Sequence, residues 1–321
     1  MYDIIVKRVK YRLLPAQNDP MKLVIAGATG LIGSLLVERL AATSHDLKLL
    51  SRKPPVQATG LHQEWVQWQP GFPGKWEQSL EGADGVINLA GEPIAGKRWN
   101  AIQKERIGSS RIDVTRAIVN AIAKAKDRPR FLINASAVGY YGHRGDEVLT
   151  EENPPGHDFL ARVCAAWEEE ANKAAALNVR VTLVRTGIVL GSGGGALAKM
   201  VTPFKLFAGG PLGSGRQWFP WIHIDDEVGL IIFLAENPNG RGAFNATAPN
   251  PVTMTEFCRS LGKALNRPSW APVPAIALKL LLGEMADMLL HGQRAVPQAA
   301  QKLGYKFRYA EVGEALSSLR L

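Results

Sequence analysis

The chain has 321 residues, 46% of them apolar, and a formal net charge of +9. This length and composition predict a globular protein with a sizeable buried core, in one large domain or two unequal ones, and they exclude a disulfide-stapled scaffold. The basic residues are spread along the chain and are not gathered in runs mixed with aromatic residues, so we expect a small-molecule partner and no nucleic acid.

Residues 1–20 are interpreted as an N-terminal extension or leader and are left out of the fold prediction. The segment has no sustained apolar run between its charges, so we expect neither a secretory signal nor a membrane anchor. The two cysteines, Cys164 and Cys258, match no metal or redox spacing. We therefore expect free thiols in a reducing cytoplasm, no bound metal and no membrane partner.

A short apolar strand followed by regularly spaced glycines begins the structured part of the chain. Residues 23–25 are predicted to form a parallel strand that is buried on both faces. The Gly-x-x-Gly-x-x-Gly spacing allows a tight turn, close approach of a pyrophosphate to the backbone, and close packing of the next helix. An ordinary strand-turn-helix with convenient glycines is the alternative interpretation. The candidate cofactor-binding residues of this turn are Gly27, Thr29, Gly30, Leu31, Ile32 and Gly33.

The end of the next predicted strand, residues 47–50, indicates which dinucleotide is bound. An NAD site places an acidic side chain there, which binds the ribose 2′-hydroxyl. Ser51, Arg52 and Lys53 stand there instead, and a 2′-phosphate requires hydroxyl and cationic groups. We therefore predict NADP(H) as the cofactor, with a solvated basic loop as the alternative interpretation.

A second strand of the same kind leads into a second candidate cofactor loop, formed by Leu89, Ala90 and Gly91. The carboxyl end of this strand is expected at the same edge of a parallel sheet as the glycine turn. A long helix is predicted over residues 97–124, and Glu105 and Arg111 in it can point to the ribose and phosphates. A solvated, ion-paired helix face is an equally good interpretation of these two residues.

The following segments repeat the alternation of strand and helix. A strand is predicted over residues 130–136 and a helix over residues 158–176, with the glutamates at 168–170 on its solvent side. Another strand covers residues 179–184. The alternation predicts an α/β protein with a Rossmann-type, doubly wound parallel sheet and right-handed crossovers.

After residue 191, glycines and clustered aromatic residues interrupt the chain, which is typical of a segment that contacts substrate. The substrate-pocket candidates are Arg216, Trp218 and His223. The alternative role for His223 is a structurally hydrogen-bonded histidine near a helix start. Asp225 and Asp226 are expected to favour that helix start by capping and through the helix dipole.

The C-terminal part is predicted to hold helices and one strand-like tail. A helix is expected over residues 255–265 and a linker over residues 268–274. The apolar tract at 278–290 is too short to span a bilayer and is interrupted by two acidic residues, so we expect a buried helix there. A strand-like segment rich in tyrosine and phenylalanine begins at residue 303.

These elements predict how the chain divides after the extension. Residues 21–191 form the NADP-binding Rossmann domain, and residues 192–321 form a smaller, loop-rich α/β portion on the substrate side. This portion includes a small C-terminal domain at about 268–321, and residues 221–250 are expected to return to the Rossmann sheet.

Eight motifs make the chain from Met21 to Leu321 similar to a known family. They are Gly-Ala-Thr-Gly-Leu-Ile-Gly, Ser-Arg-Lys-Pro, Asn-Leu-Ala-Gly-Glu-Pro-Ile, Arg-Trp-Asn, Ser-Ala-Val-Gly-Tyr-Tyr-Gly, Arg-Thr-Gly-Ile-Val-Leu-Gly, Phe-Pro-Trp-Ile-His-Ile-Asp-Asp and Pro-Val-Pro-Ala. With them the chain resembles the extended short-chain dehydrogenase/reductases, in the epimerase-family branch that is similar to nucleoside-diphosphate-sugar epimerases.

The resemblance implies an NADP-binding Rossmann domain followed by a small domain of unknown function over the last sixty or so residues. It also implies that particular residues lie close to the cofactor. These are Ser51, Arg52, Leu89, Ala90, Glu105, Arg111 and Val189, to which we add Thr186 and Gly187 of the same motif as Val189.

The chain departs from the family where proton transfer is expected. Catalytic members carry a Tyr-x-x-x-Lys pair on the helix after the serine strand, and its lysine lowers the pKa of the tyrosine. Leu160 and Cys164 stand in those positions here. Ser136 lies one residue from the family's substrate-polarising serine, and Tyr141 matches an aromatic residue before a glycine. Ser136 and Tyr141 are therefore the catalytic candidates, and Tyr140 is a second phenol in the same loop.

Two functions are compatible with this pattern. The first is an NADP(H)-dependent oxidoreductase or epimerase-like enzyme with an unknown substrate and an atypical set of acid-base residues. The second is a non-catalytic NADP(H)-binding sensor or scaffold protein, which the missing tyrosine and lysine suggest.

Overall fold

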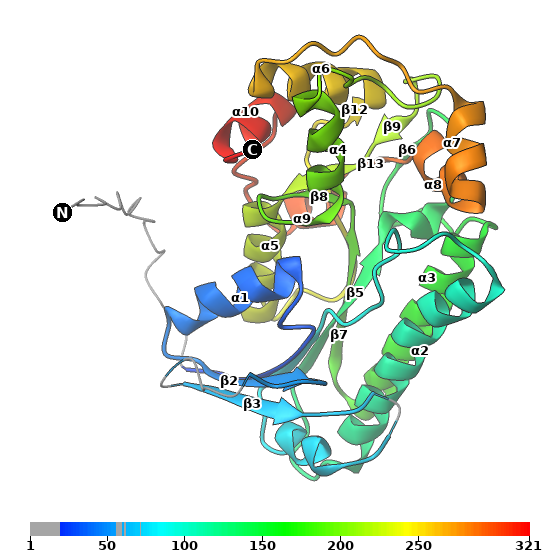
Figure 1. Cartoon of the computed structure of the whole chain (residues 1–321). Coiled ribbons are helices and arrows are strands. Elements are labelled where there is room, and N and C mark those ends of the chain that lie inside the picture. The colour runs from blue at the N-terminus through cyan, green and yellow to red at the C-terminus, as the bar shows by residue number, and fades with distance from the viewer. Residues whose placement is uncertain (1–19, 56–59, 61, 71) are drawn as a thin grey trace.

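The computed structural model describes residues 20–55, 60, 62–70 and 72–321 (Figure 1). The prediction for the N-terminal extension lies outside these residues, apart from Pro20. Seven strands form the central sheet. In chain order they are β1 (Lys22–Ala26), β2 (Asp46–Ser51), β3 (Gln63–Gln67), β4 (Gly85–Asn88), β5 (Phe131–Ala137), β7 (Arg180–Thr186) and β11 (Gly242–Ala246).

Helices and short strands connect these seven strands. The helices are α1 (Leu31–Ala41), α2 (Ala101–Lys124), α3 (Phe159–Asn172), α4 (Gly195–Lys205), α5 (Ile224–Glu236), α6 (Met254–Leu265), α7 (Ala275–Leu282), α8 (Ala286–Leu290), α9 (Gln298–Lys302) and α10 (Val312–Ser318). The 3-10 turns are η1 (Lys75–Leu80), η2 (Val138–Tyr141), η3 (Lys173–Leu177) and η4 (Gly283–Met285). The short strands pair as β6 (Val148–Leu149) with β13 (Arg294–Ala295), β8 (Ile188–Leu190) with β10 (Trp221–His223), and β9 (Trp218–Phe219) with β12 (Val252–Thr253).

The central sheet is parallel and has the order β11-β7-β5-β4-β1-β2-β3. The chain extends the sheet from β1 through β2 and β3 in one direction, and then adds β4, β5, β7 and β11 in the other. The direction changes between β1 and β4, and sheets of this type bind ligands at that point, outside the carboxyl ends of the strands. The predicted Rossmann-type, doubly wound fold is therefore confirmed.

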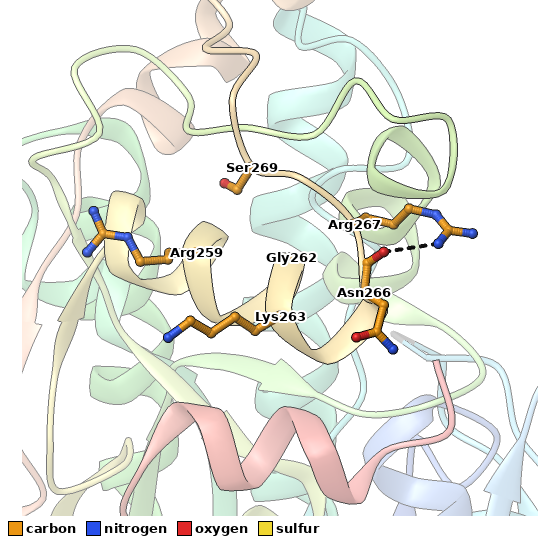
Figure 2. Close-up of a pocket in the computed structure, with 6 residues that line it drawn as sticks. All are labelled: Arg259, Gly262, Lys263, Asn266, Arg267 and Ser269. Atoms are coloured by element: carbon orange, nitrogen blue, oxygen red, sulfur yellow. Dashed lines mark hydrogen bonds between the residues drawn. The ribbon is translucent and has the colours of Figure 1, made fainter.

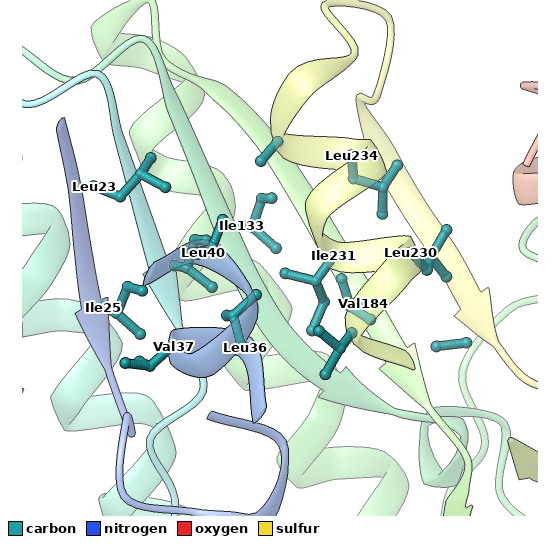
Figure 3. Close-up of a cluster of buried hydrophobic side chains, with 14 of the residues drawn as sticks. Leu23, Ile25, Leu36, Val37, Leu40, Ile133, Val184, Leu230, Ile231 and Leu234 are labelled. Atoms are coloured by element: carbon teal, nitrogen blue, oxygen red, sulfur yellow. The ribbon is translucent and has the colours of Figure 1, made fainter. Parts of the chain in front are cut away.

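Helices cover both faces of the sheet (Figure 1). On one face α1 and α5 pack side by side, with α5 over β5 and β7, and Figure 3 shows Val37 of α1 near Ile25 of β1 and Ile231 of α5 near Val184 of β7. The alternate residues Val24 and Ala26 belong to the core on the other face, which α2 and α3 cover. Because both faces are buried, β1 needs apolar side chains at every position after the exposed Lys22, which is why residues 23–26 show no polar alternation.

Side-chain caps set the starts of α2 and α3, as they also do for α5 and α6. The helix predicted from residue 97 begins at Ala101, because the Asn100 side chain accepts a hydrogen bond from the backbone N–H of Gln103 at 2.8 Å. In the same way Asp158 caps α3 by accepting from the N–H of Ala161 at 2.9 Å. These caps satisfy N–H groups that have no partner within the helix.

The prediction of a buried helix over residues 278–290 is wrong. The tract holds the end of α7, then η4 and α8, and only Leu278 of α7 is buried. Ile276, Leu280 and Leu281 are 74%, 75% and 73% exposed. An apolar composition around the whole helix indicates burial on all sides, but α7 is packed on one side alone.

The predicted strand-like tail is also not a strand. Residues 303–311 form turns and irregular backbone that lie against the start of α5. The backbone N–H groups of Arg308 and Tyr309 donate to the two carboxylate oxygens of Asp226, at 2.7 and 2.9 Å. The aromatic residues suggested a sheet, but the backbone hydrogen bonds of this segment go to a side chain.

After residue 221 the chain contributes to both a small sheet and the large one. β10 pairs with β8, and β11 pairs in parallel with β7. The domain boundaries drawn from the sequence stay predictions. No helix among the described residues combines the length and the apolar character that crossing a bilayer requires.

Candidate cofactor and active site

The glycine turn lies at the carboxyl edge of the sheet and excludes side chains at two of its glycines. Gly27 has a φ of +86°, and a Cβ there would lie 2.7 Å from the carbonyl carbon of Leu89. A Cβ on Gly33 would lie 2.2 Å from the carbonyl oxygen of Gly27. Gly30 is the N-cap of α1, and neither a side-chain cap nor an acidic residue occupies the start of that helix. The free N–H groups there suit an anion such as a pyrophosphate.

The second predicted loop lies directly against this turn. The backbone N–H of Leu89 donates to the carbonyl oxygen of Ala26 at 2.9 Å, which joins the end of β4 to the end of β1. The structure therefore brings the two loops together at one edge. Their candidate residues differ in exposure: Gly27, Leu31, Ile32, Leu89 and Ala90 are half-buried, Thr29, Gly30 and Gly91 are exposed, and Gly33 is buried.

The basic tip of β2 is next to the glycine turn, because β2 is the parallel neighbour of β1. Ser51 is 9% exposed, and its hydroxyl accepts a hydrogen bond from the N–H of Lys53 at 3.2 Å. Arg52 and Lys53 are exposed, and neither forms an ion pair with another residue in the described part of the chain. Two cations without a carboxylate partner leave their charge for an anionic ligand.

The two candidates on α2 lie in different surroundings. Glu105 is exposed to solvent. The Arg111 guanidinium donates to the carbonyl oxygens of Ile107 and Glu92, both at 3.0 Å. A Cβ on Gly91 would lie 3.2 Å from that guanidinium, so the glycine leaves the space that Arg111 fills. The structure therefore holds Arg111 against the second loop and leaves Glu105 in solvent.

The third group of candidates follows β7. Thr186, Gly187 and Val189 are all half-buried at the carboxyl edge of the sheet. A Cβ on Gly187 would lie 2.4 Å from the carbonyl oxygen of Pro220, and its N–H donates to the carbonyl oxygen of Ala246 at 3.0 Å. Close packing of two neighbouring backbones is thus a sufficient reason for glycine at this position.

Sequence reasoning missed Glu227, which lies behind Thr186. Glu227 is in the first turn of α5 and is fully buried. Its Oε1 accepts a hydrogen bond from the Thr186 hydroxyl at 2.8 Å, while Oε2 has no partner among the described residues. Burial raises the pKa of Glu227 to about 8. It was missed because acidic residues at a helix start are usually solvated and stabilise the helix dipole.

We expect Glu227→Gln to stabilise the protein increasingly as the pH rises from 4.5 to about 8. The folded pKa is raised above the ordinary value of 4.5, so the native protein loses stability in this window as the unfolded chain ionises. Glutamine does not ionise, and the gain is at most about 1.4 kcal/mol per pH unit. Urea unfolding at pH 5 and pH 8 measures it, with Glu169→Gln on exposed α3 surface as the matched control. A gain that is equal at both pH values contradicts the assignment.

A buried polar network holds the two catalytic candidates. Glu168 of α3 accepts from the Ser136 hydroxyl at 2.6 Å and forms a two-pronged ion pair with Arg185 of β7, with both contacts at 2.9 Å. Arg185 also donates to the Tyr141 hydroxyl at 2.9 Å, and this hydroxyl donates to Asn245 at 2.6 Å. All five residues are at most 5% exposed. The partners compensate the cost of removing these polar groups from water.

The network limits what Ser136 and Tyr141 can do chemically. Both hydroxyls are already hydrogen-bonded, and burial raises the pKa of Tyr141 to about 12. A buried phenol with such a pKa is a poor acid or base near neutral pH. The catalytic assignment of the two residues stays a prediction that this geometry does not favour. Tyr140 is half-buried, with the Arg185 guanidinium 3.6 Å from its ring centroid, and is the more open phenol.

The expectation that the glutamates at 168–170 all face solvent is wrong. Only Glu169 of the three is exposed. Glu168 pairs with Arg185, and Glu170 is 5% exposed and forms ion pairs with two cations. The sequence signal that could have predicted a buried glutamate was Arg185, because a single cation at the end of an apolar strand requires a carboxylate partner when it is buried.

Leu160 and Cys164 lie where the resemblance places the tyrosine and lysine of the catalytic pair. Leu160 packs against η2, where a Cβ on Gly139 would lie 3.5 Å from the Leu160 Cβ. Cys164 is 4% exposed, and burial raises the pKa of its thiol to about 12. Neither side chain can replace its counterpart as an acid or base near neutral pH.

Two of the three substrate-pocket candidates lie close together in the sequence but differ in their surroundings. Arg216 is exposed. Trp218 in β9 is half-buried, and its indole N–H donates to the carboxylate of Asp146 at 2.9 Å. The Arg294 guanidinium lies 4.5 Å from the Trp218 ring centroid. Trp218 therefore connects the loop after η2 to the C-terminal part of the chain.

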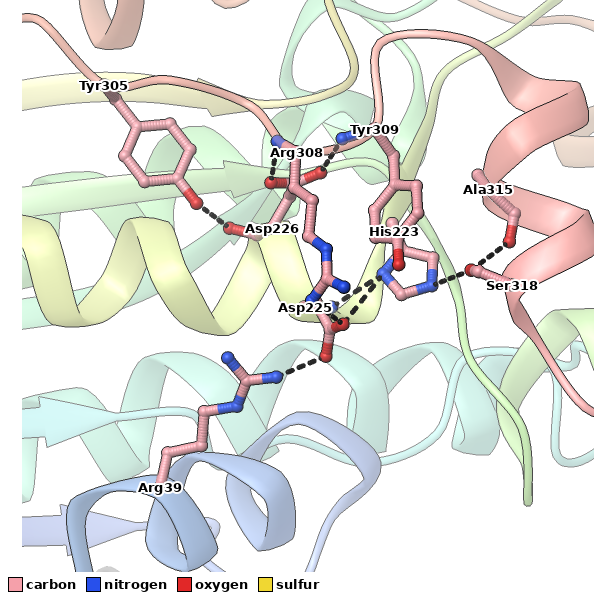
Figure 4. Close-up of polar contacts among 9 residues, drawn as sticks. All are labelled: Arg39, His223, Asp225, Asp226, Tyr305, Arg308, Tyr309, Ala315 and Ser318. Atoms are coloured by element: carbon pink, nitrogen blue, oxygen red, sulfur yellow. Dashed lines mark hydrogen bonds and ion pairs between the residues drawn. The ribbon is translucent and has the colours of Figure 1, made fainter. Parts of the chain in front are cut away.

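His223 is a structural residue in this fold and not part of an open pocket (Figure 4). The ring is 3% exposed, and its Nδ1 accepts from the N–H of Asp225 at 3.0 Å, which caps α5. Its Nε2 lies 3.1 Å from the Ser318 hydroxyl, and the ring packs on Tyr309 with centroids 4.0 Å apart. The cap expected from Asp225 and Asp226 is thus provided by the histidine.

As the pH falls, we expect the His223→Asn variant to lose less free energy of unfolding than the native protein does. Burial lowers the folded pKa of His223 to about 4 from 6.5, so the native protein loses stability as the pH falls from 6.5 to about 4. Asparagine keeps an acceptor for the cap. Between pH 7 and pH 5 the variant should lose about 1 to 2 kcal/mol less than the native protein in urea unfolding. Equal losses, or losses matched by the exposed control His157→Asn, contradict this result.

A hollow of about 560 Å³ on α6 lies apart from the candidate residues (Figure 2). In Figure 2 Arg259 and Lys263 point to one side and Arg267 to the other, so the three cations do not converge. None of the predicted cofactor or substrate residues lines this hollow. In the described part of the chain, no group of three or more His, Cys, Asp or Glu side chains is placed to hold a metal ion.

The fold and the glycine turn agree with a comparison against known families. Residues 23–246 match the NAD dependent epimerase/dehydratase family, and residues 273–319 match a domain of unknown function, DUF1731. The chain therefore belongs to the NAD dependent epimerase/dehydratase family. The predicted resemblance to this branch, with its small C-terminal domain of unknown function, is confirmed.

Within that family the chain is similar to epimerase family proteins called SDR39U1. It is 46% identical over 312 residues to the chloroplastic SDR39U1 homolog of Arabidopsis thaliana, covering 94% of this chain and 88% of that protein. It is 39% identical over 300 residues to the epimerase family protein YfhF of Bacillus subtilis, covering 93% and 98%. The crystal structure of human SDR39U1 with NADPH superimposes with a TM-score of 0.82 at 34% identity, covering 93% and 99%.

Proposed function

We propose that this protein binds NADP(H) and is an oxidoreductase or epimerase-like enzyme that acts on a small molecule. One observation carries the proposal: a backbone cradle at Gly27 to Gly33 lies beside an unpaired basic tip at Arg52 and Lys53. The cradle fits a pyrophosphate, and the tip fits the 2′-phosphate that distinguishes NADP(H). The human relative that was solved with NADPH supports the same cofactor.

The residues at the sheet edge then have distinct tasks. The N–H groups at the start of α1 bind the pyrophosphate, and Ser51 and Arg52 bind the 2′-phosphate. Arg111, held by two carbonyl oxygens, borders the second loop with a fixed positive charge. When bound, NADP(H) supplies a hydride carrier. Tyr140 is the phenol with surface left for proton exchange, since Tyr141 is fully buried.

The test is a titration of the purified chain with NADPH and with NADH, in which energy transfer from tryptophan to the reduced cofactor reports binding. NADPH should bind more tightly. Stopped-flow measurement of NADPH oxidation with carbonyl compounds and nucleotide sugars then tests turnover. Failure to bind NADPH, or a preference for NADH, contradicts the proposal.

A non-catalytic sensor or scaffold is the second candidate, and two observations favour it. Leu160 and Cys164 replace the usual acid-base pair, and the hydroxyls of Ser136 and Tyr141 are bound within the protein. NADPH binding without turnover of any substrate class, together with cofactor-dependent capture of a partner, would decide for it. For either function we propose a cytoplasmic location, which the two buried free thiols support.

A further inference from the structure

Apolar side chains from three separate parts of the chain meet at the amino-terminal ends of α2 and α3. We call them the apolar wall. Trp99 and Met285 are 9% and 7% exposed, and the others are half-buried. The Trp99 and Phe159 rings meet edge to face, with centroids 5.4 Å apart. The wall consists of Ile94, Trp99, Phe159, Leu160, Met285 and Met288.

The apolar wall lies at the candidate site and not elsewhere in the fold. Ile94 follows the second cofactor loop by three residues, and that loop continues β4. Leu160 packs against Gly139, two residues beyond the carboxyl end of β5. β4 and β5 are parallel neighbours, so both contacts fall at the carboxyl edge that carries Leu89 and Ala90. Met285 and Met288 of the C-terminal part pack in the same cluster.

The cations that border the apolar wall are largely occupied by protein partners. Lys104 pairs with Glu284, and its Nζ lies 5.3 Å from the Phe159 ring centroid. Lys199 donates to the carbonyl oxygen of Ala95 at 2.6 Å. Arg111 is bound by the two carbonyl oxygens described above, and Arg98 is exposed at Gly283. A diphosphate requires several cations or N–H groups aimed at it, whereas the one N–H among the side chains of the apolar wall, that of Trp99, already donates to the carbonyl oxygen of Ile94 at 3.0 Å.

From this lining we infer that the substrate has an uncharged, apolar body and is not a nucleoside diphosphate sugar. The inference rests on the proposed function, because it places the substrate beside the cofactor edge. The apolar surface that these half-buried side chains still expose favours a ligand that removes it from water. Two methionines in the wall suit ligands of varied shape, because their thioether side chains are flexible. The chemical class is therefore an alkyl or aryl carbonyl compound or the corresponding alcohol.

The test measures binding of a chain-length series to the NADPH-saturated protein. The probes are 2-hexanone, 2-octanone and 2-decanone, with UDP-glucose as the charged comparison, measured by calorimetric titration. We expect the affinity to rise about fourfold for each added methylene, and UDP-glucose to bind at least tenfold more weakly than 2-decanone. A series without dependence on chain length, or tighter binding of UDP-glucose, overturns the inference.

A matched pair of variants connects the result to the wall. Met288→Gln keeps the side-chain volume and should weaken 2-decanone binding about tenfold, with NADPH affinity unchanged. Leu281→Gln, on the exposed side of α7, should leave both affinities as they are. If circular dichroism shows that the Met288 variant is misfolded, Ile94→Asn replaces it. Equal effects of the wall variant and the control also overturn the inference.

The two proposals fail in different ways. Absence of NADPH binding to the native protein contradicts the proposed function. NADPH binding with a flat alkanone series leaves the proposed function standing and contradicts only the apolar substrate.

Discussion

Replacing Glu168 by alanine should lower the free energy of unfolding by about 3 to 5 kcal/mol. Arg185 is 4% exposed in the native protein, and the substitution leaves its guanidinium without a carboxylate and removes the acceptor of the Ser136 hydroxyl. Breaking a buried ion pair from one side is costly because the remaining charge cannot be resolvated inside the protein. Urea unfolding at pH 7 measures the change.

Glu169→Ala provides the control for this experiment, because it removes the same group from the next position of α3, where the side chain is exposed. It should change the free energy of unfolding by less than about 0.5 kcal/mol. A loss below about 1 kcal/mol for Glu168→Ala would show that the pair is weaker than its burial and its two hydrogen bonds indicate.

Replacing Arg52 by glutamate should weaken NADPH binding about 100-fold and leave NADH binding within about threefold. The change removes a cation at the basic tip and puts a negative charge near the 2′-phosphate, which NADH lacks. Two charge-assisted hydrogen bonds lost at about 1.5 kcal/mol each account for this ratio. Fluorescence titration with both cofactors measures it.

Lys263→Glu is the matched control for Arg52→Glu, since it changes the net charge equally on the exposed side of α6. It should leave the ratio of NADPH to NADH affinity unchanged. If Arg52→Glu also leaves that ratio unchanged, the tip of β2 does not select the cofactor, and the interpretation of this segment is wrong.

The sheet could be predicted because its signals are local. Apolar runs such as residues 23–25 alternate with helical patterns, and this alternation alone requires parallel strands joined by crossovers. The glycine turn was predictable for a similar reason, since the Cβ of Gly27 or Gly33 would collide within the turn or with the adjacent loop. The spacing of residues along the chain was therefore sufficient to predict the fold class and the position of the cofactor edge.

The buried network could not be predicted in the same way, because its members come from distant segments. Tyr141 and Asn245 are 104 positions apart, and Ser136 and Glu168 are 32 apart. Helical periodicity placed Glu168 on the solvent side, and only the three-dimensional position of Arg185 reverses that expectation. Tertiary pairing overrides a periodicity argument whenever a buried cation requires a carboxylate.

The errors in the C-terminal part have a related cause. Composition predicted that the apolar residues of α7 would be covered, but composition does not state how many neighbours a helix has. The aromatic residues after 303 suggested a strand, but a strand needs a partner strand whose hydrogen-bonding groups are free. Here the backbone N–H groups of Arg308 and Tyr309 are bonded to the Asp226 carboxylate and are not available to a partner strand.

The attachment of the tail to Asp226 bears on how the sequence of this protein can change. The carboxylate binds the backbone N–H groups of residues 308 and 309, which every amino acid except proline provides. These two hydrogen bonds therefore accept any residue except proline at positions 308 and 309, while Tyr305 and Tyr309 are constrained separately by their packing on Phe233 and His223. For these two bonds the chemical requirement falls on the Asp226 carboxylate, which lies far away in the sequence from the segment that it holds.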